Sequence, residues 1–126
     1  DVDVLCTTTP VEDPVISSIE NDNIHINAMG ADAPDKQEIE TDLTTADDMN
    51  IFVDSYSQAM HSGEISVPVS RGRIQEDDIY GNLGEVVNKS IELNDINKEK
   101  TLFDSTGLAI QDISSAYLVY NEEFDV

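Results

Sequence analysis

Residues His25 to Glu38, HINAMGADAPDKQE, set the pattern around which the chain is organised. Ile24–Ala28 is a compact run of apolar and β-compatible residues, which predicts a short buried strand. Gly30–Pro34 predicts a turn, and the residues after it are compatible with a helix. Ligands of open α/β sheets bind at the carboxyl ends of strands, so Asp32 and Lys36, just past this strand, are candidate site residues.

Three further short apolar runs are predicted to form strands of the same sheet. They cover residues 2–8, 51–53 and 101–104. The four runs alternate with helical or loop segments at spacings of roughly 25 residues, a pattern typical of βαβ units and a parallel sheet. Each strand ends in small hydroxylated, glycine or acidic residues, which allow a ligand to approach the backbone closely. These strand ends are Thr7–Thr9, Gly30–Asp32, Asp54–Ser55 and Ser105–Gly107.

Helices are predicted between and after these strands. Apolar residues recur at helical spacing over residues 37–49 and, interrupted by two glycines, over residues 79–87. Residues 63–72, which contain glycine, proline and serine, are predicted to be irregular. The longest helical pattern covers residues 108–123. The predicted fold class is therefore α/β.

The chain is strongly acidic. Its 126 residues, the length of one domain, include 27 Asp and Glu against 6 Lys and Arg, for a formal net charge of −21. A polyanion is repelled by nucleic acid and by anionic membranes, so neither is expected as a partner. Two interpretations stay open. One is a halophilic, salt-adapted surface, which the spread of acids along the chain favours; the other is a local acidic patch on part of a larger protein.

Cys6 is the only cysteine, so no internal disulfide can form, and this fits a cytoplasmic protein. It has no basic neighbour and is expected to be a small buried residue. The two histidines and the acids lack metal-ligand spacing, so no metal site is predicted. No signal peptide or membrane span is predicted. The chain has no initiator Met and opens within an apolar strand, as expected of a fragment.

Several residues have both a chemical and a structural interpretation. Asp32 can act as a general acid or base, or its side chain can bond its own turn backbone. Lys36 can neutralise a phosphate or carboxylate, or lie in solvent at a helix start. Ser105 and Thr106 can contact a ligand or cap the following helix. His25, between two isoleucines, is expected to be structural.

Three motifs share one order and spacing with a known family. They are CTTTPVEDPVI at 6–16, HINAMGADAPDKQE at 25–38 and FDSTGLAIQD at 103–112. HSGEISVPVSRGRI at 61–74 and LGEVV at 83–87 belong to the same similarity. Together they resemble the second half of the ornithine cyclodeaminase/mu-crystallin family, and most closely its archaeal alanine dehydrogenase-like branch. The resemblance covers essentially the whole chain.

The resemblance implies a partial Rossmann-type NAD-binding domain over residues 1–107, made of its later parallel strands and flanking helices. Residues 108–126 would form a C-terminal helix that belongs to, or packs on, a substrate-binding and dimerisation domain outside this chain. The chain contains no GxGxxG motif, and the family's glycine-rich loop belongs to the preceding part. A homodimer is implied for the intact protein, and the isolated chain is expected neither to bind NAD tightly nor to turn over.

The resemblance also implies roles for single residues. Asp32 matches the family's catalytic aspartate, which moves protons beside the nicotinamide, and apolar surroundings are expected to raise its pKa. Thr106 matches a position that faces the substrate. Two positions depart from the family, because Asp35 replaces a glycine and Met29 a smaller aliphatic residue. The implied cofactor contacts are Thr9, Met29, Gly30, Ala31, Asp32, Lys36 and Ser105.

The implied function is NAD-dependent amino-acid metabolism. Ornithine cyclodeaminase comes first, with conversion of L-ornithine to L-proline and ammonia by hydride transfer to and from NAD. Alanine dehydrogenase, which converts L-alanine to pyruvate and ammonia, is the alternative within the family. A non-catalytic, mu-crystallin-like ligand-binding protein or an inactive truncated product is the alternative of another class.

Overall fold

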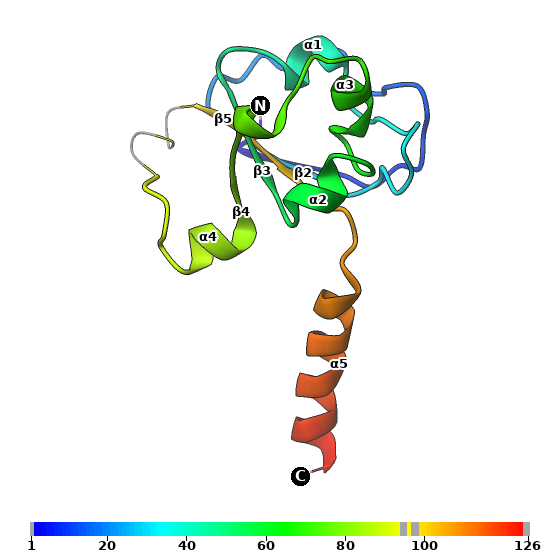
Figure 1. The fold of residues 1–126 in the computed structure, drawn as a ribbon, viewed down its shortest axis with the longest axis vertical. Helices are drawn as coiled ribbons and strands as arrows, with labels where there is room; N and C mark the ends of the chain where they lie inside the picture. The colour runs from blue at the N-terminus through cyan, green and yellow to red at the C-terminus, as the bar shows by residue number, and fades with distance from the viewer. Residues whose placement is uncertain (1, 94–95, 97–98, 125–126) are drawn as a thin grey trace.

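A sheet of five parallel strands forms the body of the chain within residues 2–93, 96 and 99–124, the part that this computed structural model describes (Figure 1). The strands follow the order β1-β2-β5-β3-β4 from one edge to the other. The predicted α/β class and parallel sheet are confirmed. The strands are β1 Val4–Thr7, β2 His25–Ala28, β3 Met49–Val53, β4 Ile79–Asn82 and β5 Lys100–Asp104.

The carboxyl ends of four strands lie level with one another. Thr7 is opposite Ala28, Ala28 is opposite Asp104, and Asp104 is opposite Val53. Because the strands are parallel, the segments that leave them start from the same side of the sheet. We call this side the strand-end edge. It consists of residues 8–9, 29–32, 54 and 105–106.

One face of the sheet carries the hydrophobic core. Alternate strand side chains such as Ile26, Val53 and Leu102 are fully buried there, together with Ile39 and Ile65 from the connecting segments. The connections from β1 through β4 cover this face with short helices (Figure 1). These are α1 Thr41–Thr44, α2 Tyr56–Ala59, α3 Ser66–Ser70 and the 3-10 turn η1 Glu76–Asp78.

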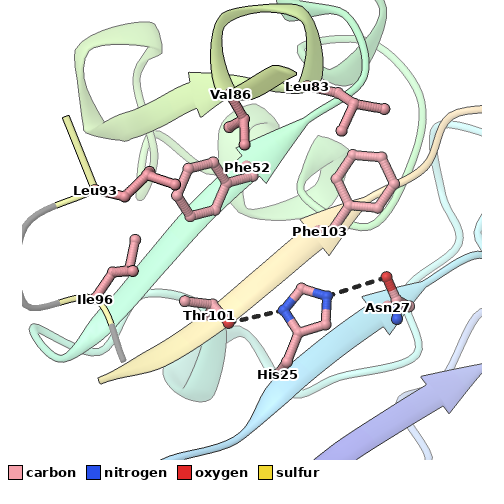
Figure 2. A pocket seen from close by; sticks show the side chains of 9 residues that line it. All are labelled: His25, Asn27, Phe52, Leu83, Val86, Leu93, Ile96, Thr101 and Phe103. Carbon is pink, nitrogen blue, oxygen red and sulfur yellow. Dashed lines mark hydrogen bonds between the residues drawn. The ribbon is translucent and has the colours of Figure 1, made fainter. Parts of the chain in front are cut away.

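The opposite face bears the other alternate side chains, and α4, Leu83–Val87, lies over part of it (Figure 2). A hollow of about 410 Å³ lies there, lined mostly by apolar side chains from β3, β5 and α4. At its polar end, His25 Nδ1 lies 2.8 Å from Thr101 Oγ1, and His25 Nε2 lies 3.2 Å from Asn27 Oδ1. Both ring nitrogens have partners, as expected of a structural histidine.

Cys6 is exposed, so the expectation that it would be buried is wrong. It lies on β1, the edge strand, and alternates with Leu5 and Thr7, which point toward the covered face. Val4 has the same parity as Cys6 and is 55% exposed. Within the described ranges, little packs over this outer part of the sheet. The strand predicted from the apolar pattern is confirmed as β1, but the pattern does not reveal which face of the sheet is covered.

The helix predicted over residues 37–49 is wrong for most of its length, because only α1 forms. Residues before α1 run extended, and Ile39 forms a parallel bridge with Ile16. The Ile16 amide donates to the Glu38 carbonyl at 2.9 Å, and the Glu40 amide donates to the Ile16 carbonyl at 2.9 Å. These long-range hydrogen bonds occupy backbone groups that a helix would need, so tertiary pairing overrides the periodic pattern.

Two other segments also differ from the prediction. Residues 63–72, predicted to be irregular, contain α3, where Pro68 stands in the first turn and its missing N–H removes no helical hydrogen bond. Residues 79–87 are β4 followed by α4 rather than one helix. Asn82 marks the change, because it ends β4 and its side chain accepts a 3.0 Å hydrogen bond from the Glu85 amide as the N-cap of α4.

The last helix, α5, Ala109–Phe124, confirms the longest helical prediction and extends away from the sheet (Figure 1). Its apolar side chains are exposed, among them Ile110 at 63%, Ile113 at 62% and Tyr117 at 64%. An apolar helix surface of this kind usually packs against another element or chain. Among the described residues, no helix is long and apolar enough to cross a membrane.

Candidate functional site

The strand-end edge brings together residues from distant parts of the chain. The Met29 amide donates to the Thr7 carbonyl at 3.0 Å, and the Ser105 amide donates to the Ala28 carbonyl at 3.0 Å. The turn after each strand is thereby tied to the neighbouring strand. Most residues predicted to contact the cofactor lie on this edge: Thr9 follows β1, Met29–Asp32 follows β2 and Ser105 follows β5, whereas Lys36 lies beyond it.

The carboxylate of Glu38 joins the ends of β1 and β2. Its Oε1 accepts hydrogen bonds from the Thr9 amide at 2.5 Å and the Thr9 hydroxyl at 2.7 Å. Its Oε2 accepts from the Thr7 hydroxyl at 2.6 Å and the Gly30 amide at 2.9 Å. Burial alone would raise the pKa of Glu38, but these four donors outweigh it and hold the pKa below its usual value. Glu38 is therefore charged at neutral pH.

Gly30 is needed because the ends of β1 and β2 approach each other closely. A Cβ atom at this position would lie 2.3 Å from the Thr9 carbonyl oxygen and 2.5 Å from Glu38 Oε1. One of these atoms is backbone, and the other is held by two hydrogen bonds, so neither can move aside without disturbing the edge. The requirement for glycine is one of space.

Two further carboxylates lie buried beneath the edge. The Glu38 and Ile39 amides donate to the Glu64 carboxylate at 2.9 and 2.7 Å. The Glu64 and Ile65 amides in turn donate to the Asp104 carboxylate at 3.0 and 3.1 Å. Burial raises the pKa of Glu64 to about 8 and that of Asp104 to about 7, outweighing the amide hydrogen bonds that favour the charged form.

Thr106 is held on the far side of β5 by Asp54. Its amide and hydroxyl donate to the two Asp54 oxygens at 2.8 and 2.7 Å, and Gln58 donates to its carbonyl at 3.1 Å. The residue is only 8% exposed. The Thr106 hydroxyl is therefore engaged with the end of β3, and this argues against the helix-capping interpretation.

Asp32 lies at the exposed rim of the edge. Its side chain is 71% exposed and forms an ion pair with Lys36, whose side chain is 23% exposed. The hydrogen bond and charge of Lys36 hold the pKa of Asp32 below its ordinary value. The expectation of a raised pKa is wrong for this chain, because the carboxyl group lies in water beside a cation rather than in apolar surroundings.

The other residues of the Met29–Asp32 turn differ in their exposure to solvent. Met29 is 55% exposed, whereas Ala31 is 3% exposed and can offer mainly its backbone to a ligand. Across the described ranges, no group of three or more His, Cys, Asp or Glu side chains is placed to hold a metal ion.

Sequence reasoning missed the carboxylate series formed by Glu38, Glu64 and Asp104, which are all fully buried. Asp104 had one usable signal, because it stands two residues after buried Leu102 on the same strand and so shares its face. Glu38 and Glu64 had none, because each stands in a stretch that reads as polar or irregular. Their burial follows from long-range hydrogen bonds.

We expect the free energy of unfolding to fall as the pH rises from about 5 to about 8, because Glu64 holds its proton more tightly in the folded chain. The unfolded chain ionises this group above its ordinary value of 4.5, while the folded chain does so only near 8. The stabilisation from protonated Glu64 is therefore fully present below the unfolded pKa of 4.5, and it is lost progressively as the pH rises to the folded pKa of about 8. Urea unfolding across this range should show a flatter pH dependence in Glu64→Gln, and an unchanged slope would contradict the assignment.

Comparisons with known proteins agree with this architecture. The chain matches the model of the ornithine cyclodeaminase/mu-crystallin family over residues 1–125. It is 45% identical over 120 residues to an alanine dehydrogenase of Archaeoglobus fulgidus, covering 94% of this chain and 36% of that protein. An archaeal alanine dehydrogenase dimer with bound NAD has a TM-score of 0.85 and 43% identity, covering 98% of this chain and 39% of its own.

A third relative carries a different activity. The Δ1-pyrroline-2-carboxylate reductase of Thermococcus litoralis, solved with NADH and L-proline, has a TM-score of 0.86 and 30% identity, with 97% of this chain and 38% of that chain covered. The chain thus spans 36 to 39% of the length of these relatives. The sequence match extends over almost the whole chain, and the two structural matches cover 97 and 98% of it. The chain therefore belongs to the ornithine cyclodeaminase/mu-crystallin family.

Proposed function

We propose that this chain is the C-terminal part of an NAD-dependent enzyme that oxidises the α-carbon of a small amino acid or reduces the corresponding imine. The observation that carries the proposal is the strand-end edge, where the turns after β1, β2 and β5 meet beside the Asp32–Lys36 ion pair. Family membership and the NAD- or NADH-bound state of the solved relatives support the choice of cofactor.

The edge suits a long cofactor with an anionic centre. The ends of β1, β2 and β5 lie level with one another, so a ligand can lie along them. Short side chains or backbone are presented there by Thr9, the Met29–Asp32 turn and Ser105. Lys36, which pairs with Asp32, supplies positive charge in a chain of 27 acidic and 6 basic residues. In this proposal these residues hold NAD, which would supply a hydride acceptor or donor beside Asp32. In the same proposal Thr106, whose hydroxyl is held by Asp54, lies on the substrate side.

Asp32 is the proposed proton carrier. Because Lys36 lowers its pKa, the carboxylate is ionised at neutral pH and is ready to accept a proton. It would take that proton from the water or amine that attacks the imino carbon, and return it to the departing ammonia. This requires the carboxylate to lie within about 3 Å of the attacking group, or one water molecule away.

Two substrates remain candidates. The resemblance of the sequence motifs placed ornithine cyclodeaminase first, and the family name keeps that activity in view. The 45% identity to an alanine dehydrogenase favours oxidation of L-alanine to pyruvate and ammonia, so we place this activity first and ornithine cyclisation second. The side chains that select between them are expected in the part of the protein outside this chain.

The exposed face of α5 is proposed to pack on that other part. We propose that residues 108–126 belong to a substrate-binding and dimerisation domain and that residues 1–107 complete an NAD-binding domain. The exposed apolar side chains of α5 support this division, as does the share of the relatives that the chain spans. A homodimer is proposed for the intact protein, since one solved relative is a dimer.

We also propose that the surface is salt-adapted. The net charge of −21 would be screened at high ionic strength, where carboxylates keep a protein soluble without strong self-repulsion.

The direct test is an activity assay of the full-length protein with NAD. We expect L-alanine to produce NADH, pyruvate and ammonia in equal amounts, because the α-carbon hydride passes to the cofactor. L-Ornithine should give little product under the same conditions. Formation of L-proline and ammonia without net NADH would instead assign the cyclodeaminase activity.

A calorimetric titration separates the enzyme from its alternatives. NAD binding without turnover of either amino acid would favour a mu-crystallin-like ligand-binding protein. Absence of NAD binding by the full-length protein would refute the proposed function. The 126-residue chain alone is expected not to bind NAD with sub-micromolar affinity, because the rest of the cofactor site is assigned to the preceding domain half.

A further inference from the structure

Three buried acidic side chains, Glu38, Glu64 and Asp104, are linked in series beneath the strand-end edge, and a backbone hydrogen bond joins Asp54, at the end of β3, to the last of them. Glu38 accepts hydrogen bonds from the ends of β1 and β2, and its own amide donates to Glu64. The Glu64 amide donates to Asp104 at the end of β5. The Asp54 amide donates to the Asp104 carbonyl at 3.3 Å, and Asp54 binds Thr106. The series therefore runs across the ends of β1, β2, β5 and β3, and its three carboxylates Glu38, Glu64 and Asp104 are fully buried.

We propose that Glu38 is a positioning residue for the cofactor: it fixes the ends of β1 and β2 at the separation at which the backbone beyond them can accept NAD. This inference rests on the proposed function. Glu38 itself is fully buried and touches no ligand in this assignment. It acts through Thr9 and Gly30, which are the residues assigned to the cofactor.

The geometry requires a carboxylate rather than any polar side chain. Each Glu38 oxygen accepts two hydrogen bonds, and all four donors are amide N–H or hydroxyl groups. A glutamine could accept on one side only, and its NH₂ group would face either the Thr9 amide or the Gly30 amide donor to donor. The ends of β1 and β2 lie so close that a Cβ at Gly30 would be 2.3 Å from the Thr9 carbonyl oxygen, so a repulsive pair of donors at Glu38 would push these strand ends apart.

The test compares Glu38→Gln and Glu38→Asp in the full-length protein, with Thr44→Ala as the matched control. Thr44 is 1% exposed on α1, and its hydroxyl binds only the nearby Thr41 carbonyl at 3.0 Å among the described contacts. The control therefore creates a buried defect away from the strand-end edge. The readouts are the Kd for NAD, the KM for the amino acid at saturating NAD, and the Tm.

For Glu38→Gln we expect the Kd for NAD to rise about 10-fold or more, as follows from losing hydrogen bonds to a charged group. The KM for the amino acid at saturating NAD should change little. Glu38→Asp keeps the charge and should restore part of the NAD affinity. Thr44→Ala should lower the Tm and leave the Kd for NAD within about twofold, because a remote buried defect does not reach the edge.

Thr7→Val is the second variant, for the case in which Glu38→Gln does not fold. Thr7 is 6% exposed and is not assigned to the cofactor, and its hydroxyl donates to Glu38 Oε2. Valine keeps the shape of threonine and removes that one hydrogen bond. The Kd for NAD should therefore rise about threefold, which corresponds to part of the free energy of one hydrogen bond to a charged group.

The outcomes separate this inference from the proposed function. If wild-type protein binds NAD and all edge variants bind equally well when folded, Glu38 is only a structural residue and this inference is overturned. If wild-type protein does not bind NAD at all, the proposed function fails, and the inference fails with it. The inference would also be overturned if Glu38→Gln and Thr44→Ala raised the Kd for NAD by the same factor for the same loss of Tm.

Discussion

Replacing Asp32 with Asn in the full-length protein should lower kcat by about 10² to 10⁴-fold, the usual contribution of general acid–base catalysis. The substitution keeps the size of the side chain but removes its ability to accept a proton. Because Asp32 is exposed in the described structure and contributes no core packing, the Tm should change little. Steady-state kinetics at saturating NAD and substrate measure the effect, and thermal unfolding checks the fold.

Asp35→Asn is the matched control for this substitution. Asp35 is also exposed, stands three residues away and carries the same charge. If both variants lose activity equally, the effect comes from the charge of the turn and not from proton transfer at Asp32. Full activity in Asp32→Asn would exclude the assigned role.

The acid limb of the pH–rate profile is a second measurement of the role of Asp32. Lys36 lowers the pKa of Asp32, so the activity of the wild-type protein that depends on this carboxylate should persist below its ordinary pKa of 3.8 wherever the fold survives. Lys36→Met should move that limb to higher pH.

The second large effect is expected on stability, for Gly63→Ala. Gly63 has a backbone φ of 98°, which L side chains rarely adopt, and a Cβ there would lie 2.6 Å from Asp104 Oδ1 and 2.9 Å from Thr106 Cγ2. The Asp104 carboxylate cannot withdraw easily, since it is buried and accepts the Glu64 and Ile65 amides. Backbone strain together with this overlap should cost about 3 kcal/mol or more of unfolding free energy.

Gly72→Ala isolates the contribution of the contact. Gly72 also has a positive φ, 68°, but no atom lies within 4 Å of the point that a Cβ would occupy, so only the backbone conformation is penalised. That penalty should be about 1–2 kcal/mol. Chemical denaturation of the two variants should therefore differ clearly. Equal losses would show that the packing of Gly63 against Asp104 contributes nothing to the stability of the fold.

The strands and the strand-end edge could be predicted from the sequence because their signals are local. The apolar run before Met29 and the polar residues after it mark a strand and its end within a few positions. The same pattern recurs before Thr9 and before Ser105. Parallel pairing then places these ends at one side of the sheet, so the predicted candidates come together there.

Predictions failed where distant hydrogen bonds compete with local preference. Residues 37–49 have helical periodicity, but the backbone around Ile39 pairs with the segment at Ile16 and only α1 remains helical. The raised pKa expected for Asp32 is wrong for this chain for a local reason, because Lys36, four residues further on, and solvent surround its carboxyl group in place of apolar neighbours.

By itself, the sequence determined the α/β class, the parallel sheet and the turn that carries Asp32, because each depends on residue types at short spacing, and its motifs supplied the resemblance to the family. Only the tertiary structure decided that Glu38, Glu64 and Asp104 form a buried series beneath the strand ends. The physical reason is that a carboxylate can be buried only when enough N–H and O–H donors surround it or its pKa is raised. Apart from the Gly30 amide, which is 8 residues from Glu38, those donors come from segments 25 to 40 residues away in the chain.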